Sequence, residues 1–92
     1  MALPASARVD IERYWKTIER SAQIGTGRPG GLSRLALGDA DRQMRDEFVG
    51  WCREAGLAVR VDGMGNIFAR RSGLDDGLPP VVIGSHLDTQ VN

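Results

Sequence analysis

The feature that most constrains this chain is a short apolar run that becomes polar at its end. Residues 81–83 (Val-Val-Ile) follow a Pro-Pro pair, and such a run is typical of a strand buried on both faces, as in a mostly parallel sheet covered by helices. The run continues into Gly-Ser-His-Leu-Asp-Thr at residues 84–89. Open α/β sheets place ligands and chemistry at the carboxyl ends of such strands. We therefore expect a buried strand within 81–89 with a functional site at its end.

The candidate site residues in this run are His86 and Asp88. They are two residues apart, so both side chains project from the same face of an extended chain. A carboxylate beside an imidazole suits a metal site, because one ring nitrogen can bind the ion while the other donates its proton to the carboxylate. On the residues alone, a structural histidine with satisfied hydrogen bonds is the more common situation, and both interpretations stay open at this point.

Two helices are predicted from the spacing of apolar residues. The first begins near Val9 and is stopped by Gly25, and its apolar stripe is expected to pack in the core. That stripe consists of Ile11, Tyr14, Trp15, Ile18 and Ala22. The second helix is capped by Asp39 or Asp41 and is followed by Gly56. Its stripe consists of Met44, Phe48, Trp51, Cys52 and Ala55, which makes Cys52 a buried structural thiol.

A hairpin follows the second helix. Residues 57–61 have strand periodicity, with Leu57, Val59 and Val61 on one face. Residues 62–65 (Asp-Gly-Met-Gly) provide a turn, and 66–71 form the returning strand. Asn66 is assigned to this hairpin and not to a substrate contact. The order is helix, helix, strand, strand, strand, which predicts an α/β fold with an incomplete sheet, since nothing follows to finish covering the last strand.

The glycine-rich loop over residues 25–38 has two interpretations. It is either a connector, with Arg28 and Arg34 in solvent, or an ordered loop over a site, because long loops in compact domains are often functional. Either arginine could approach a substrate carboxylate through its bidentate fork. Solvated arginines are the expectation retained here, so neither is included among the site residues.

Composition excludes several classes of function. The 92 residues allow one small domain, and 12 basic against 12 acidic residues give zero net charge, which predicts no nucleic-acid partner. No apolar run approaches the ~20 residues of a membrane span. Residues 1–8 lack the apolar centre of a signal peptide and are expected to be a frayed end. A single cysteine rules out an intrachain disulfide and favours the cytoplasm.

Four motifs in order resemble a known family. They are Gly-Gly-Leu-Ser-Arg-Leu-Ala-Leu (30–37), Ala-Gly-Leu (55–57), Asp-Gly-Met-Gly-Asn (62–66) and Gly-Ser-His-Leu-Asp-Thr-Gln (84–90). Together they resemble the N-terminal part of the hydantoinase/carbamoylase group of the M20 metallohydrolase superfamily. That group includes N-carbamoyl-L-amino-acid hydrolases, β-ureidopropionases and allantoate amidohydrolases. The resemblance covers nearly all of this chain but a minor part of a family member.

The resemblance implies a fold, a site and a reaction. Residues 1–92 would be part of an α/β/α catalytic domain without the family's inserted dimerisation domain. His86 would be a metal ligand and Asp88 the catalytic carboxylate that orients it, in a site for two divalent ions, zinc or manganese. The complete enzyme would be a homodimer that hydrolyses C–N bonds of small carbamoyl or ureido compounds. No substrate-binding residue is assigned.

The remaining ligands and the general base come later in the family's sequence. One histidine with one orienting carboxylate does not hold an ion firmly, since catalytic zinc sites use about three protein ligands. We therefore expect the 92-residue chain alone to bind no metal stably and to be inactive. Two alternatives remain: a stand-alone α/β interaction module with a structural His86, and a piece of an M20 dipeptidase or deacylase.

Overall fold

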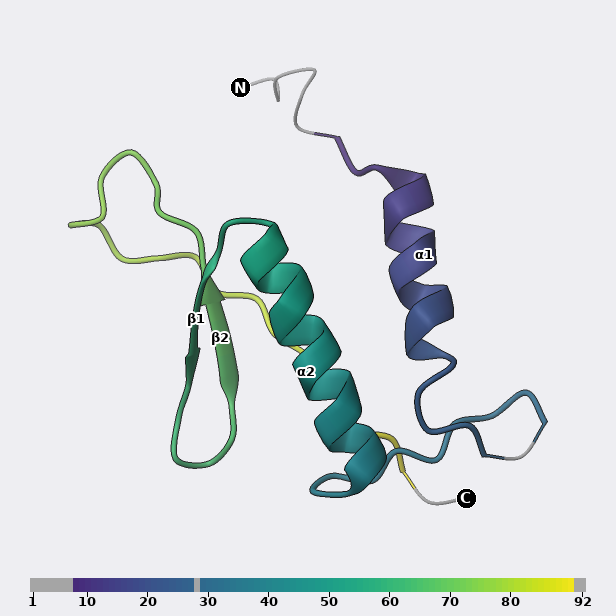
Figure 1. The fold of residues 1–92 in the computed structure, drawn as a ribbon. Coiled ribbons are helices and arrows are strands. Elements are labelled where there is room, and N and C mark those ends of the chain that lie inside the picture. The colour runs from purple at the N-terminus through teal and green to yellow at the C-terminus, as the bar shows by residue number, and fades with distance from the viewer. Residues whose placement is uncertain (1–7, 28, 91–92) are drawn as a thin grey trace.

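The computed structural model describes residues 8–27 and 29–90. These contain helix α1 (Ile11–Ser21), helix α2 (Asp39–Glu54), strand β1 (Ala58–Val61) and strand β2 (Ile67–Arg70), in that order. The hairpin lies on one side of α2 and α1 lies on the other (Figure 1). The predicted helix–helix–hairpin order is confirmed, as is an α/β arrangement with an incomplete sheet. The expected frayed end falls on residues 1–7, outside the described part, and on the exposed Arg8.

Helix α1 begins at a side-chain cap and ends earlier than the sequence predicts. The Asp10 carboxylate accepts a hydrogen bond from the Arg13 backbone N–H at 3.1 Å, which satisfies one of the free donors of the first turn. The helix ends at Ser21, before Gly25. Gly25, at φ +78°, then turns the chain, and this left-handed conformation favours glycine.

Neither aspartate that was expected to cap α2 is its N-cap residue. Gly38 holds that position and has no side chain with which to cap. Asp41 is buried and reaches back, so that its Oδ2 accepts a hydrogen bond from the Leu37 backbone N–H at 3.0 Å. This contact resembles a capping box shifted by one residue, and Asp39 and Asp41 still place negative charge near the positive end of the helix dipole.

The hairpin forms as expected, and its turn is built on Asp62. Strands β1 and β2 pair antiparallel, with Val59 opposite Ala69 and Val61 opposite Ile67. Asp62 Oδ1 accepts the backbone N–H groups of Met64 and Asn66, at 3.0 and 2.8 Å. The Asn66 side-chain amide donates to Oδ2 at 3.0 Å. Asn66 is thus a hairpin residue, and these hydrogen bonds lower the pKa of Asp62, the Asn66 side-chain bond having the largest effect.

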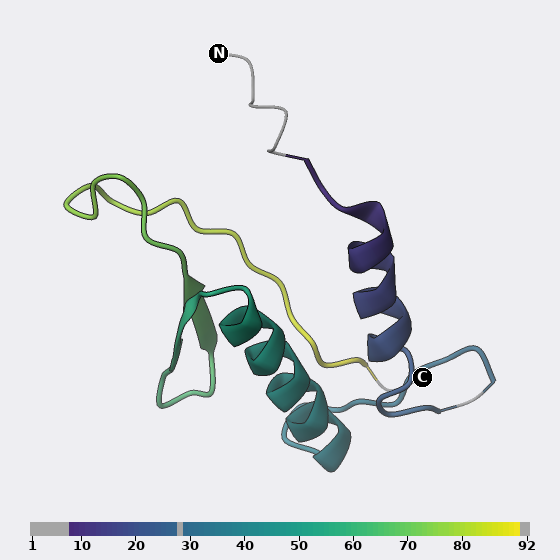
Figure 2. The ribbon, with the colours of Figure 1, turned by 45° about the horizontal axis from the view of Figure 1, so that its top comes forward.

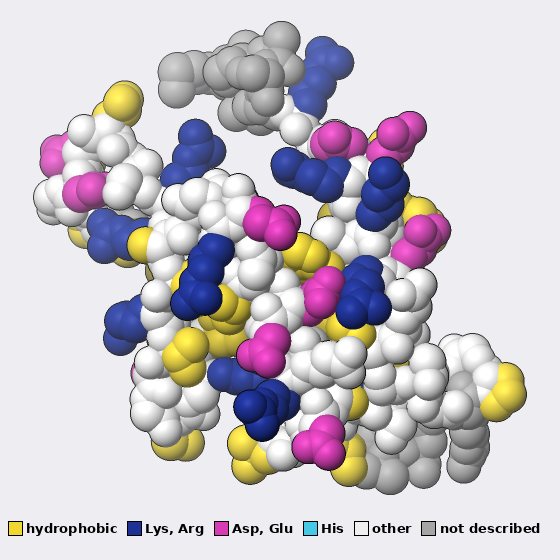
Figure 3. Space-filling view, in the orientation of Figure 1, with side chains coloured by type: hydrophobic (Ala, Val, Ile, Leu, Met, Phe, Trp, Pro, Cys, Tyr) yellow, Lys and Arg dark blue, Asp and Glu magenta, His cyan; other side chains and the backbone are white. Residues whose placement is uncertain are grey.

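The buried core is small and does not include the stripe of α1. Ile24 and Met44 are 1% exposed and Cys52 is 6% exposed. Ile11, Tyr14, Trp15 and Ile18 were expected in the core, but all are exposed, and α1 buries no residue. This expectation is wrong because α1 has little of the described chain to pack against. Apolar side chains accordingly appear on the surface over both helices (Figure 3).

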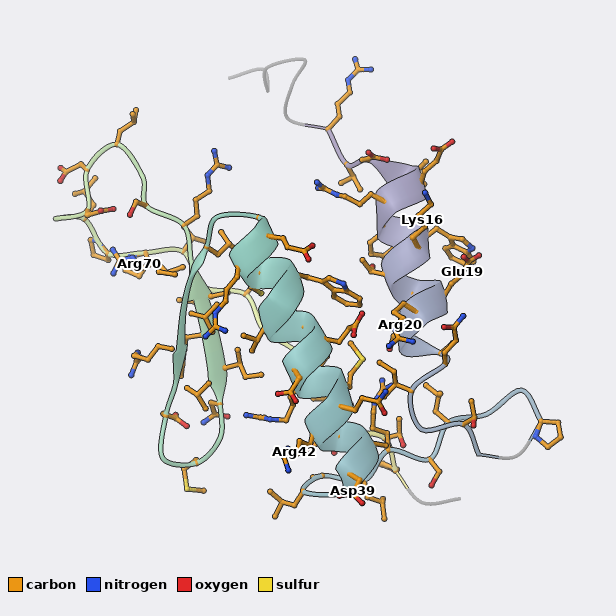
Figure 4. The ribbon with its side chains drawn as sticks, viewed as in Figure 1. Lys16, Glu19, Arg20, Asp39, Arg42 and Arg70 are labelled. Atoms are coloured by element: carbon orange, nitrogen blue, oxygen red, sulfur yellow. The ribbon has the colours of Figure 1, made fainter. Side chains whose placement is uncertain are left out.

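A charged pair, Arg20 and Glu47, joins the two helices. Arg20, on the side of α1 that faces α2 (Figure 4), donates from Nε to Glu47 Oε1 at 3.1 Å. Both side chains keep substantial contact with water, and such pairs contribute little to stability. None of the described helices is long and apolar enough to cross a membrane.

The predicted third strand is not formed. Residues 81–90 run without regular secondary structure along α2 and back toward the loop between the helices (Figure 2). Val81, Val82 and Ile83 are 96, 75 and 93% exposed. The prediction of a buried strand is therefore wrong for the described residues. The physical reason is that none of the described strands pairs with this segment and none of the described helices covers residues 81–83, so their apolar side chains stay exposed.

Candidate functional site

The described part of the glycine-rich loop between the helices, residues 25–27 and 29–38, is ordered. Thr26 and Leu32 form an isolated antiparallel bridge, and the Ser33 N–H donates to the Gly25 carbonyl at 2.7 Å. A Cβ on Gly25 would lie 2.8 Å from the Ser33 carbonyl oxygen, so the two sides of this loop approach too closely for a side chain there. The described part of the loop therefore supports the interpretation of an ordered loop, and its last part contacts the candidate site through Arg34.

Arg34 is buried, and its side chain makes four hydrogen bonds. Its Nη1 donates to the backbone carbonyls of Ser21 and Ile24, at 2.9 and 2.8 Å, and its Nη2 donates to Ser21 Oγ at 3.0 Å. Its Nε donates to the Leu87 carbonyl at 2.8 Å. The expectation of a solvated Arg34 is wrong, because carbonyls at the end of α1 and in the site segment replace water around its charge. Arg28 lies outside the described residues.

The backbone of Arg34 also contacts the site segment. Its N–H donates to Thr89 Oγ1 at 2.8 Å, and its carbonyl accepts the Thr89 N–H at 2.7 Å. These bonds and the Leu87 bond place residues 87–89 against the loop, and Leu87, Asp88 and Thr89 are correspondingly half-buried. The polar end of the segment is thus held, whereas its apolar beginning is exposed.

His86 and Asp88 lie together, as their spacing in extended chain requires. His86 Nδ1 is 2.9 Å from the Asp88 backbone oxygen and 3.3 Å from Asp88 Oδ1. A proton on Nδ1 is therefore shared by two acceptors of the same residue, and this arrangement favours the tautomer whose Nε2 carries a free lone pair. The imidazole is 74% exposed, and Nε2 makes no hydrogen bond to any described residue.

The contacts between His86 and Asp88 are those expected of one histidine ligand of a metal site. A ligating histidine commonly donates its other ring N–H to a carboxylate or a backbone carbonyl, and His86 has both within reach at Asp88. Over 8–27 and 29–90, no three His, Cys, Asp or Glu side chains gather closely enough to hold an ion. The roles of His86 as ligand and Asp88 as orienting carboxylate stay predictions.

Cys52 behaves as a structural thiol. It is buried on α2, and burial raises its pKa above the usual thiol value. The thiolate is the reactive form of cysteine, and a raised pKa makes it scarcer at neutral pH. These properties are in keeping with the structural role that the sequence predicts for Cys52.

Sequence reasoning missed Arg34 as part of this site. The sequence does contain a signal that Arg34 is buried. Arg34 is the sole charged residue within 29–38, a run otherwise made of glycine, proline, serine and apolar residues. A lone charge in such surroundings is seldom buried unless it is paired. The four acceptors could not be found from the sequence, because three lie in the preceding helix and turn and one lies at Leu87.

The chain is similar in sequence and in structure to known amidases, although no family model matches it. It is 48% identical over 91 residues to an N-carbamoyl-L-amino-acid amidohydrolase of Rhizobium meliloti, covering 98% of this chain and 22% of that protein.

Two solved structures are also similar to this chain. A hydantoinase/carbamoylase family amidase from Burkholderia ambifaria is 54% identical with a TM-score of 0.85, covering 89% of this chain and 20% of its own. An amidase of that family from Burkholderia vietnamiensis is 48% identical with a TM-score of 0.88, covering 96% and 21%. The chain thus spans about a fifth of the length of these relatives.

Proposed function

This chain is homologous to a part of the hydantoinase/carbamoylase amidases, and from that premise we propose that it supplies one metal ligand, His86, of an N-carbamoyl-L-amino-acid hydrolase. The observation that carries the proposal is the imidazole of His86, whose Nδ1 contacts Asp88 and whose Nε2 makes no hydrogen bond to a described residue. The relative from Rhizobium meliloti supports the substrate class, a small N-carbamoyl-L-amino acid. A homodimer in the cytoplasm completes the proposal, and the single buried thiol is in keeping with a reducing compartment.

His86 and Asp88 have distinct tasks in this proposal. Asp88 keeps the proton of His86 on Nδ1 and holds the ring in one orientation, so that Nε2 presents its lone pair to an ion. Two divalent ions, zinc or manganese, supply Lewis-acid chemistry when bound, because they polarise the substrate carbonyl and acidify water. The described residues provide one imidazole toward these ions, so the other ligands and the general base must come from elsewhere in the complete enzyme.

Exposure argues against a stand-alone interaction module. Such a module would need its apolar run covered by its own helices, but Val81 and Ile83 are 96 and 93% exposed and α1 buries no residue. Surfaces of this kind normally pack against another element. The relatives described above favour the carbamoylase over the dipeptidase or deacylase alternative, because they are named as carbamoyl-amino-acid amidohydrolase and as hydantoinase/carbamoylase amidases.

The proposal is tested in a chimera: the Rhizobium meliloti enzyme with its aligned segment replaced by this chain. We expect the chimera to release free amino acid from an N-carbamoyl-L-amino acid. His86→Ala should abolish this release and lower the metal content per subunit, and Asp88→Asn should lower kcat by about 10–100-fold. Asp46→Asn, which alters an exposed carboxylate on α2, is the matched control and should change neither quantity.

Two results would overturn the proposal. One is a chimera that elutes as the host enzyme does, has the host's circular dichroism and yet lacks activity. The other is a His86→Ala chimera with full activity and full metal content. If the chimera does not fold, the substitutions are made at the aligned positions of the unaltered host enzyme. Full activity and full metal content after the substitution to alanine there would overturn the role assigned to His86.

A further inference from the structure

Arg34 is the only described residue that ties the candidate site segment to the rest of the chain by hydrogen bonds. Within 8–27 and 29–90, three hydrogen bonds join residues 81–90 to other elements, and all three involve Arg34. Two use its backbone and contact Thr89, and one uses its side chain and contacts the Leu87 carbonyl. No other described side chain or backbone group replaces these contacts.

The guanidinium is held from the opposite side by the end of α1. The carbonyls of Ser21 and Ile24 and the Ser21 hydroxyl accept its remaining bonds, at 2.8–3.0 Å. These groups lie at the negative end of the helix dipole, where a cation is favourable. Arg34 is 4% exposed, so its planar fork is fixed in one orientation, and a flexible ammonium would not reproduce that geometry.

The contacts of Arg34 flank Asp88. The Leu87 carbonyl belongs to the peptide bond before Asp88, and Thr89 provides the amide after it. Asp88 in turn presents both oxygens that lie near His86 Nδ1. We infer that Arg34 is a positioning residue, which fixes the backbone around Asp88 and thereby aims the imidazole of His86. This inference rests on the proposed function of His86, and it adds a residue that touches neither metal nor substrate.

The test uses the chimera and four variants. Arg34→Met removes the fork, Arg34→Lys keeps the charge, and Thr89→Val removes the hydroxyl that accepts the Arg34 N–H while keeping the side-chain shape. Arg71→Met is the matched control, because Arg71 is exposed and its side chain makes no hydrogen bond within the described residues. Each variant is measured for kcat, KM, metal content and the ring ¹⁵N chemical shifts of His86, which report its tautomer.

A positioning role has a distinct signature. We expect Arg34→Met to lower kcat and metal affinity by about 10–100-fold, the range found for residues that orient metal ligands, with KM close to that of the unsubstituted chimera. Arg34→Lys should recover part of the loss, and Thr89→Val should shift the His86 ring signals toward a mixture of tautomers. A merely structural role would lower the thermal midpoint and leave kcat, metal content and ring signals of the folded fraction unchanged.

The failures of the two proposals are distinguishable. An inactive, folded, unsubstituted chimera overturns the proposed function, and the inference about Arg34 falls with it. An active chimera in which the folded Arg34→Met and Thr89→Val variants keep full kcat, metal content and ring signals overturns the inference alone. If the Arg34→Met variant does not fold, the Thr89→Val variant tests the inference by itself, because the Thr89→Val substitution leaves no buried charge without a partner.

Discussion

Arg34→Met should loosen the candidate site locally, and the size of the effect follows from a single hydrogen bond. Of the four bonds of the guanidinium, one reaches the site segment, from Nε to the Leu87 carbonyl at 2.8 Å. A hydrogen bond from a charged donor contributes about 1.5–3 kcal/mol. Losing it should lower the free energy of local opening around Thr89 by this amount, because the two backbone bonds to Thr89 remain.

This loss is measurable as hydrogen exchange. The Thr89 amide is protected by its bond to the Arg34 carbonyl, and protected amides exchange through local opening. A change of 1.5–3 kcal/mol corresponds to roughly 10–150-fold faster exchange. Mass spectrometry of the chimera should show this acceleration at Thr89. The Asp62 amide, which donates to the Asn66 carbonyl in the distant hairpin, should keep its rate.

Two outcomes would refute this reasoning. One is an unchanged rate at Thr89, which would mean that the guanidinium does not hold the segment. The other is an equal acceleration at Thr89 and Asp62, which would mean that Arg34→Met destabilises the whole domain. Arg71→Met controls for the loss of one positive charge and should leave both rates as they are.

Asp62, Cys52 and Gly25 each make local contacts that can be tested separately. Hydrogen bonds lower the pKa of Asp62 in the folded state. The Asp62 carboxylate therefore contributes to stability above its unfolded pKa, and this contribution is lost as pH falls through the folded pKa. The NMR signal of the Asn66 side-chain amide should sharpen or shift over that acidic range, and a pH-independent signal would contradict this. Cys52 should resist alkylation in the folded chimera and react on unfolding, as mass spectrometry would show; equal rates in both states would mean that the thiol is accessible. Gly25→Ala should lower the thermal midpoint more than Gly50→Ala. A Cβ on residue 25 would lie 2.8 Å from the Ser33 carbonyl oxygen and the φ of this residue is +78°, whereas a Cβ on residue 50 would meet no atom within 4 Å. Equal midpoints for the two variants would show that the loop adapts to the added methyl group.

The local elements of this fold could be predicted from the sequence. The helices and the hairpin depend on contacts between residues close in sequence, such as the Asp62–Asn66 turn and the Asp10 cap. Such contacts leave a periodic or compositional signal. The α2 cap was missed because Asp41 acts from inside the helix on the Leu37 N–H, while the sequence pattern favours a side chain at the cap position itself.

Burial could not be predicted in the same way. An apolar stripe indicates which face a helix can bury, but not whether a partner is present to cover it. The stripe of α1 and the run at Val81–Ile83 both have the pattern of buried elements, and both are exposed in the described chain. The same limit hid Arg34, whose partners come from segments on both sides of its loop.

The candidate site was partly accessible from the sequence. The spacing of His86 and Asp88 predicts that their side chains lie on one side of an extended chain, and the two are 3.3 Å apart at their nearest ring and carboxylate atoms. The second contact, in which the Asp88 backbone oxygen lies 2.9 Å from Nδ1, could not be predicted from the spacing, because it depends on the exact backbone conformation of residues 86–88.

The most direct measurement of the central claim is a crystal structure of the active chimera, with anomalous diffraction recorded at the zinc absorption edge. The proposed role of His86 predicts an anomalous peak about 2.0–2.1 Å from His86 Nε2, with Nδ1 still directed at Asp88. A metal bound in the site without His86, or a ring whose Nδ1 has turned away from Asp88, would contradict it.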